Sequence, residues 1–177
     1  MSLFEFDLKD IRSRIPDLRA GDMVKLSGIC YTARDAAHKK LFSLLDEGRD
    51  LPIDIKDACI YFAGPTPAPE NLPIGSCGPT TSGRMDPYSP RLLDLGLAAM
   101  IGKGERSEEV RQAVIRNKAV YFCAVGGAGA LCAKHIKAYE EIAFPELGCE
   151  SIKRLELEEF PVFVGIDCLG NTLFKEN

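Results

Sequence analysis

Hydrophobic and polar residues alternate along residues 23–31, and this period of two predicts a strand with one buried face. A helix should follow over residues 33–47, with Thr32 as its N-cap. A second strand is expected over residues 57–63, and three prolines within residues 64–69 should end it, because proline cannot donate to a ladder. The first third of the chain therefore predicts a strand, a helix and a strand, in that order.

The middle of the chain carries two predicted helix starts. A polar, glycine-rich stretch over residues 75–86 runs into Ser89 and Pro90, which predict an N-cap and the first residue of a helix. Ser107 predicts the N-cap of a further helix that continues to Lys118 and carries acidic residues in its first turn.

Strands dominate the last third of the pattern. Residues 119–125 are apolar enough for a buried strand, which the glycines of residues 126–129 should end before a short helix. Three further strands are predicted, at residues 151–157, 162–166 and 172–174. Because helices and strands alternate early and strands dominate late, we expect an α/β fold or a layered β/β/α domain.

The composition narrows this picture to a globular domain. The chain has 177 residues, of which 46% are hydrophobic and 27% charged, so we expect a single domain over residues 1–177 with a substantial core. Twenty-two basic and 26 acidic residues give a net charge of −4, which argues against nucleic acid or a membrane surface as partner. No apolar run suits a membrane span and no signal peptide is recognisable, so a cytoplasmic protein is expected.

The seven cysteines predict reduced thiols rather than a disulfide framework, because their number is odd and they lie in apolar segments. Cys30, Cys59, Cys123 and Cys168 are expected to pack in the core. The cysteines show no metal-ligand spacing, so we expect no metal bound by this chain alone.

Two arginines at loop-to-helix junctions are the strongest candidates for binding an anion. Arg34 follows the first predicted strand, and Arg84 lies in the glycine-rich loop just after the three hydroxyls of residues 80–82. A guanidinium beside the free N–H groups of a helix start recognises carboxylate or phosphate. The alternative is that the arginines form surface ion pairs, Arg34 with Asp35 or a nearby acid and Arg84 with Asp86.

Two weaker features remain open at this point. His38 lies one helical turn after Arg34, and catalysis, substrate contact, capping and surface exposure are all compatible with that position. The glycines of residues 126–129 could form an anion nest, but they lack the spacing of a dinucleotide-binding loop. Tight packing of a strand against a helix is the favoured explanation for them.

Four segments carry a specific resemblance. Residues 28–39 read GICYTARDAAHK and residues 78–86 read GPTTSGRMD, with YFAGP at residues 61–65 and MIGKG at residues 100–104. In these segments the chain resembles the β subunit of class I, iron–sulfur-dependent fumarate hydratase and the paralogous β subunit of L(+)-tartrate dehydratase. The resemblance extends from about residue 18 to residue 173.

The resemblance implies a swivelling β/β/α domain that docks on an iron–sulfur α subunit. That partner would hold a [4Fe–4S] cluster, and the active site would form between the two subunits. Six residues take roles from the matching positions: substrate binding for Arg34, Arg84, Lys103 and Thr81, and catalysis for Thr80 as base and for His38. Because Met1 precedes the region of resemblance without a cluster-bearing domain, we expect a separate subunit in a heterotetramer or a dimer of αβ pairs.

The resemblance also implies a hydro-lyase that needs its α subunit for the reversible hydration of fumarate to L-malate. Abstracting a proton beside a carboxylate builds negative charge, which fixed cations stabilise, and the partner's cluster would act as the Lewis acid for hydroxide. A tartrate dehydratase β subunit is the near alternative. A carboxylate-binding or interaction domain without catalysis is the more distant one.

Overall fold

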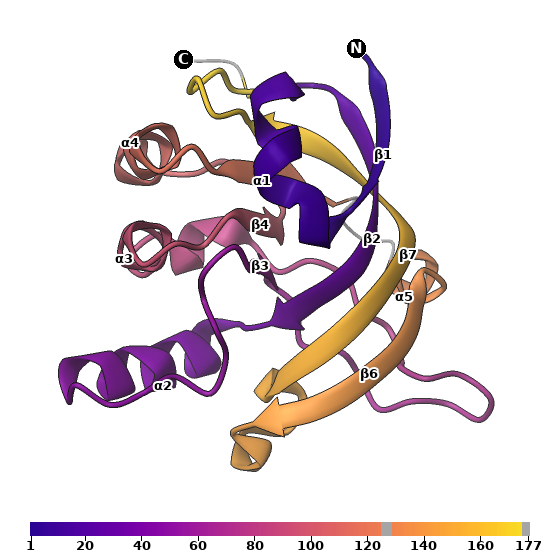
Figure 1. Cartoon of the computed structure of the whole chain (residues 1–177). Coiled ribbons are helices and arrows are strands. Elements are labelled where there is room, and N and C mark those ends of the chain that lie inside the picture. The colour runs from indigo at the N-terminus through magenta and orange to yellow at the C-terminus, as the bar shows by residue number, and fades with distance from the viewer. Residues whose placement is uncertain (125–128, 175–177) are drawn as a thin grey trace.

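The computed structural model describes residues 1–124 and 129–174 (Figure 1). Within these residues, seven strands share one sheet: β1 (Leu3–Asp7), β2 (Met23–Thr32), β3 (Cys59–Tyr61), β4 (Ala99–Gly102), β5 (Val120–Cys123), β6 (Ile136–Ala143) and β7 (Ile152–Ile166). The α-helices are α1 (Ile11–Arg14), α2 (Asp35–Asp46), α3 (Ser89–Asp94), α4 (Glu108–Arg116) and α5 (Gly129–Ala133). Short 3-10 helices lie at Leu8–Asp10, Ile15–Asp17, Ser82–Met85 and Pro145–Glu150.

The strands β1 to β5 lie side by side in chain order and run parallel to one another. Parallel neighbours need crossover connections, and α2, α3 and α4 lie in the connections from β2 to β5. The long strand β7 runs antiparallel to β2, β5 and β6. Strand pairing therefore forms a closed circuit, in which β2, β3, β4, β5 and β7 each pair with the next and β7 pairs back with β2. The α/β class predicted from the sequence is confirmed.

Two hydrophobic cores lie on opposite faces of these strands. Side chains alternate between the faces, so Tyr61 and Phe122 belong to the core that the strand circuit encloses. Their neighbours Ile60 and Tyr121 belong to the second core, which includes residues of α2, α3 and α4. Figure 1 shows these three helices on the same side of β3 and β4.

Several predicted elements are confirmed, but two predicted caps are wrong. Strand β2 and helices α2 and α4 lie where the pattern placed them, and the Ser107 hydroxyl caps α4 by accepting from Val110 N–H. Thr32 is the last residue of β2 rather than a cap, and its hydroxyl accepts from Lys153 N–H at 3.1 Å. Ser89 is the first residue of α3, and its hydroxyl donates to the Met85 carbonyl at 3.1 Å. Both hydroxyls also accept from residues far along the chain, Thr32 from Lys153 and Ser89 from Arg106, rather than from the N–H groups they were expected to cap.

The last third of the chain differs from its predicted strands. The strands expected at residues 151–157 and 162–166 are one strand, β7, which passes through Glu159 with a positive φ of 49°. The third predicted strand reduces to a single bridge between Thr172 and Ile166. The pattern also missed β1 and β6. Most of β6 is exposed, so it has no apolar alternation to reveal it.

The glycine-rich segment at residues 126–129 lies mostly outside the described residues, so neither explanation for it is tested. Only Gly129 is described, as the first residue of α5. Among residues 1–124 and 129–174, no helix combines the length and the apolar character that crossing a membrane requires.

Candidate functional site

The carboxyl ends of parallel strands bring the predicted cations to one edge of the sheet. Thr32 at the end of β2 pairs with Tyr61 at the end of β3, and Tyr61 pairs with Ile101 one residue before the end of β4. Arg34 lies two residues beyond β2, and Lys103 is the first residue beyond β4. In α/β folds, open or closed, ligands bind at the carboxyl ends of the parallel strands.

The predicted hydroxyl loop lies across the ends of β3 and β4. Thr80 N–H donates to the Phe62 carbonyl at 2.7 Å, directly after β3. Ser82 N–H donates to the Lys103 carbonyl at 2.9 Å, and Thr81 forms a parallel bridge with Lys103. The fold therefore places Thr80 and Thr81 beside Lys103, although 20 or more residues separate them in the chain.

Asp35 connects the two predicted arginines. Its Oδ2 atom accepts a hydrogen bond from Arg84 Nη2 at 3.1 Å and lies 4.0 Å from Arg34 Nε. Arg34 Nε also lies 3.8 Å from Glu150 Oε1, so the predicted pairing of Arg34 with nearby acids is confirmed. The predicted pairing of Arg84 with Asp86 is wrong. Arg34, Arg84 and a carboxylate thus meet at one point of the site.

Lys103 differs from the two arginines. Its ammonium has no ion-pair partner among the residues that the structure describes. The side chain is half-buried at the end of β4. Of the three predicted cations, Lys103 is therefore the one whose charge is not shared with a carboxylate of the described chain.

The position of the Arg34 side chain leaves no room for a side chain at residue 64, which is a glycine. A Cβ on Gly64 would lie 2.9 Å from Arg34 Cδ and 3.1 Å from the Cys149 carbonyl oxygen. The backbone after β3 and the carbonyl of residue 149 therefore flank the Arg34 side chain closely. Its guanidinium is only partly exposed and has a limited choice of conformations.

Asp86 belongs to a buried ion pair that the sequence did not suggest. Arg106 Nε donates to Asp86 Oδ1 at 2.6 Å, and the Arg106 side chain is fully buried. The guanidinium carbon lies 5.2 Å from the ring centre of Phe62 and 4.8 Å from that of Tyr121. Asp86 also accepts from Ser107 N–H at 2.7 Å. This pair joins the segment that carries Arg84 to the start of α4, and no local pattern marks partners 20 residues apart.

His38 is buried beneath Arg34. Its Nδ1 lies 2.8 Å from the Arg34 carbonyl oxygen, which can only accept, so Nδ1 carries the proton. The ring packs on Phe62 and Tyr88, with ring centres 5.6 Å and 5.4 Å away. Burial lowers the pKa of His38 to about 4. The surface-exposed alternative for His38 is wrong, and its catalytic role stays a prediction.

A family model described as Fumarase C-terminus matches residues 2–177. The chain belongs to the fumarase C-terminus family. Residues Arg34, Arg84, Lys103 and the hydroxyl loop all lie within the matched region.

Individual relatives of this fumarase C-terminus chain carry two kinds of name. It is 40% identical to the anaerobic class I fumarate hydratase of Escherichia coli over 171 residues, which cover 96% of this chain and 31% of the relative. It is 38% identical to fumarate hydratase 2 of Leishmania major over 94% of this chain and 30% of the relative. A Methanocaldococcus jannaschii protein, provisionally named L(+)-tartrate dehydratase subunit beta, is 36% identical over 95% of this chain and 87% of its own length. The chain thus spans about three-tenths of these two fumarate hydratases.

The described cysteines do not suit an iron–sulfur cluster, which binds thiolates. Cys30, Cys59 and Cys77 are buried, and burial raises the pKa of each thiol, to about 12 for Cys77. No group of three or more histidine, cysteine or acidic residues in the described part of the chain is placed to hold a metal. Core packing is confirmed for Cys30 and Cys59, and the half-buried Cys123 and Cys168 pack against the two cores from their margins.

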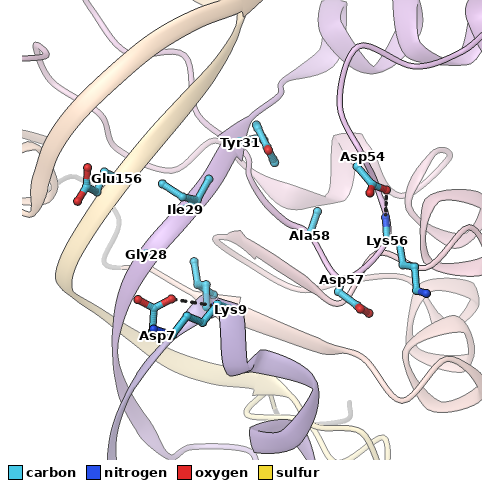
Figure 2. A pocket seen from close by; sticks show the side chains of 11 residues that line it. Asp7, Lys9, Gly28, Ile29, Tyr31, Asp54, Lys56, Asp57, Ala58 and Glu156 are labelled. Atoms are coloured by element: carbon cyan, nitrogen blue, oxygen red, sulfur yellow. Dashed lines mark hydrogen bonds between the residues drawn. The ribbon is translucent and has the colours of Figure 1, made fainter.

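A hollow away from the predicted residues lies between β2, the first 3-10 helix and the loop before β3 (Figure 2). Gly28 in its wall has a φ of +97°, and a Cβ there would overlap the Asp7 carboxylate. The lining carries two lysines and four acids: Lys9, Lys56, Asp7, Asp54, Asp57 and Glu156. Its excess of negative charge disfavours a dicarboxylate, in contrast to the edge that carries Arg34, Arg84 and Lys103.

Proposed function

We propose that this chain is the β subunit of a class I hydro-lyase that reversibly hydrates fumarate to L-malate. The observation that carries the proposal is that Arg34, Arg84, Lys103, Thr80 and Thr81 all lie at one edge of the sheet, with the two arginines joined through Asp35 and Thr81 bridged to Lys103. A dicarboxylate carries two negative charges and presents oxygens that guanidinium groups bind in pairs. Three cations from separate loops suit such a ligand.

Asp35 supports carboxylate binding at this position. A single carboxylate oxygen already lies between the two guanidinium groups, within hydrogen-bond distance of Arg84 and 4.0 Å from Arg34. A substrate carboxylate would meet the same two groups. Because the Asp35 pair with Arg84 is exposed, exchanging one carboxylate for another costs little free energy.

Proton transfer is assigned to Thr80. The reaction adds or removes a proton at the carbon beside a carboxylate, and negative charge develops on that carboxylate. Lys103 and the arginines would stabilise this charge, and the same cations favour the deprotonated form of a neighbouring hydroxyl. Thr81 would bind substrate. The buried, neutral His38 would fix the Arg34 backbone through its bond to the carbonyl.

The [4Fe–4S] cluster is assigned to an α subunit rather than to this chain, because the described cysteines do not suit it. The relatives support this division. The two fumarate hydratases named above are about three times as long as the matching region, whereas the relative named as a subunit beta has nearly its length. We place the site at the contact between the subunits, in a dimer of αβ pairs.

A tartrate dehydratase β subunit is the second candidate. The Methanocaldococcus jannaschii relative supports it, because the two chains match over most of both lengths. The same cations would bind tartrate, which is also a dicarboxylate.

The deciding experiment is an anaerobic assay of this chain with a cluster-loaded α subunit. We expect loss of fumarate absorbance only in the mixture, and no L-tartrate dehydration. Turnover of tartrate but not fumarate would favour the second candidate. Inactivity towards both in a well-formed complex would contradict both.

Arg84→Ala separates catalysis from a pure docking role, with Arg91→Ala as matched control because Arg91 forms a similar exposed ion pair with Asp46. We expect Arg84→Ala to assemble normally and to lower kcat/KM roughly 10- to 100-fold, as for one lost hydrogen bond to a charged group. Arg91→Ala should keep wild-type turnover. Failed assembly of Arg84→Ala would instead indicate an interaction domain.

A further inference from the structure

Two buried tyrosine hydroxyls hold the Thr80–Thr81 segment from opposite faces of the sheet. Tyr61 of β3 donates to the Cys77 carbonyl at 2.6 Å, ahead of the threonines. Tyr121 of β5 contacts Ser82 Oγ at 2.9 Å, directly after them. Tyr61 belongs to the core inside the strand circuit and Tyr121 to the core beneath the helices. The segment is therefore fixed on both sides of the predicted catalytic hydroxyl.

The hydrogen bonds around Tyr121 form a network in which the donor and the acceptor of each bond can be assigned. The Tyr121 hydroxyl lies 2.8 Å from the Gly104 carbonyl, which can only accept, so Tyr121 uses its single hydrogen there. The Ser82 hydroxyl must then donate to Tyr121. Ser82 Oγ in turn accepts from Lys103 N–H at 3.0 Å. Every polar group in this hydrogen-bond network has a partner. Removing one group would leave other buried polar groups of the network unpaired.

This hydrogen-bond network fixes the backbone of Lys103. Its N–H is bound by Ser82, its carbonyl accepts from Ser82 N–H at 2.9 Å, and the next carbonyl, of Gly104, is bound by Tyr121. Ser82 Oγ also packs directly against the backbone of Gly102, where an added Cβ would overlap it. Lys103 therefore leaves the end of β4 in one fixed direction.

We propose that Tyr121 is a positioning residue, whose hydroxyl sets the direction of the Lys103 side chain and the place of Thr81 relative to the substrate. The proposal rests on the proposed function, since Lys103 and Thr81 act on a dicarboxylate there. Tyr121 itself does not touch substrate. Its ring is fully buried, and its hydroxyl is used within the protein.

The test is Tyr121→Phe, which keeps the ring and removes only the hydroxyl. The control is Asn171→Ala, which removes the amide that binds Asp167 beyond the end of β7, away from the predicted site residues. Kinetics are measured on the chain assembled with its α subunit. Thermal unfolding and hydrogen exchange of the Lys103 amide are measured on the same variants.

For Tyr121→Phe we expect kcat/KM to fall roughly tenfold, within the 100-fold that a misplacement of about 1 Å can cost. The Lys103 amide should exchange faster than in wild type. Asn171→Ala should lower the unfolding temperature but leave both kcat/KM and Lys103 exchange unchanged. Unchanged kinetics or unchanged Lys103 exchange in Tyr121→Phe would overturn the proposal.

The two proposals fail in different ways. If the wild-type complex turns over neither fumarate nor tartrate, the proposed function is wrong. Lys103 exchange then still decides the positioning claim. Faster exchange in Tyr121→Phe alone would support Tyr121 as the group that fixes Lys103, and equal exchange in both variants would refute it.

Discussion

Two ion-pair regions lie near each other in this molecule and differ in nearly every physical respect. Arg106 is fully buried against two aromatic rings and bonds Asp86 at 2.6 Å. Arg84 is half exposed and shares Asp35 with Arg34 at longer distances. A buried charge that loses its partner is strongly destabilised, whereas an exposed one is solvated by water. The buried pair thus holds its two segments together, whereas the exposed pair can open at little cost in free energy, as the proposed binding of a substrate carboxylate to Arg84 requires.

The largest effect expected from this comparison is that of Asp86→Ala. The variant leaves the Arg106 guanidinium buried without its partner, so the free energy of unfolding should fall by about 3 kcal/mol or more. Urea denaturation of the wild type and the variant measures this difference. A loss below about 1 kcal/mol would mean that the Asp86–Arg106 pair stabilises the fold no more than an exposed ion pair does, which would contradict the comparison.

Acid should lower the free energy of unfolding through the buried side chain of His38. Its pKa is about 4 in the fold against an ordinary value of 6.5, because burial disfavours the charged ring. The unfolded chain therefore binds a proton at higher pH than the folded one. Stability from the neutral ring is complete above pH 6.5 and is lost as the pH falls towards 4, by about 3 kcal/mol in total.

Comparing wild type with His38→Gln isolates this contribution from carboxylates that titrate in the same range. The unfolding free energy of wild type should fall more steeply between pH 7 and pH 4, as measured by denaturant titrations at several pH values. Parallel pH profiles for the two proteins would show that His38 does not titrate as its burial requires.

The smallest effect is expected at the exposed pair. Asp35→Asn should change the free energy of unfolding by less than about 1 kcal/mol, since Arg84 remains solvated and Arg34 keeps Glu150 as its ion-pair partner. It also removes a carboxylate that competes with substrate, so the KM for fumarate should fall by up to about fivefold. Asp46→Asn, which breaks the similar Arg91 pair, should leave KM unchanged. A KM that rises in Asp35→Asn would mean that Asp35 orients the arginines instead of competing for them.

Local sequence pattern was a good guide wherever the governing interactions are short in range. The alternation at residues 23–31 and the Ser107 cap predicted β2 and the start of α4, because neighbouring residues decide both. Thr32 was misjudged because its hydroxyl is taken by Lys153, which lies 121 residues away. Strand β6 was missed because an exposed edge strand carries little apolar pattern.

The sequence by itself determined which residues could bind an anion, since Arg34, Arg84 and the hydroxyl loop are marked by residue type and by their place at strand and helix ends. Only the tertiary structure decided how these residues meet. The parallel order of β2, β3 and β4 brings their carboxyl ends to one edge, and Asp35, Arg106 and Tyr121 find their hydrogen-bond partners near it. Such contacts join residues that the chain separates by tens of positions, and burial sets their strength. Neither these contacts nor the burial of their groups exists until the strands have paired and the helices have packed on them.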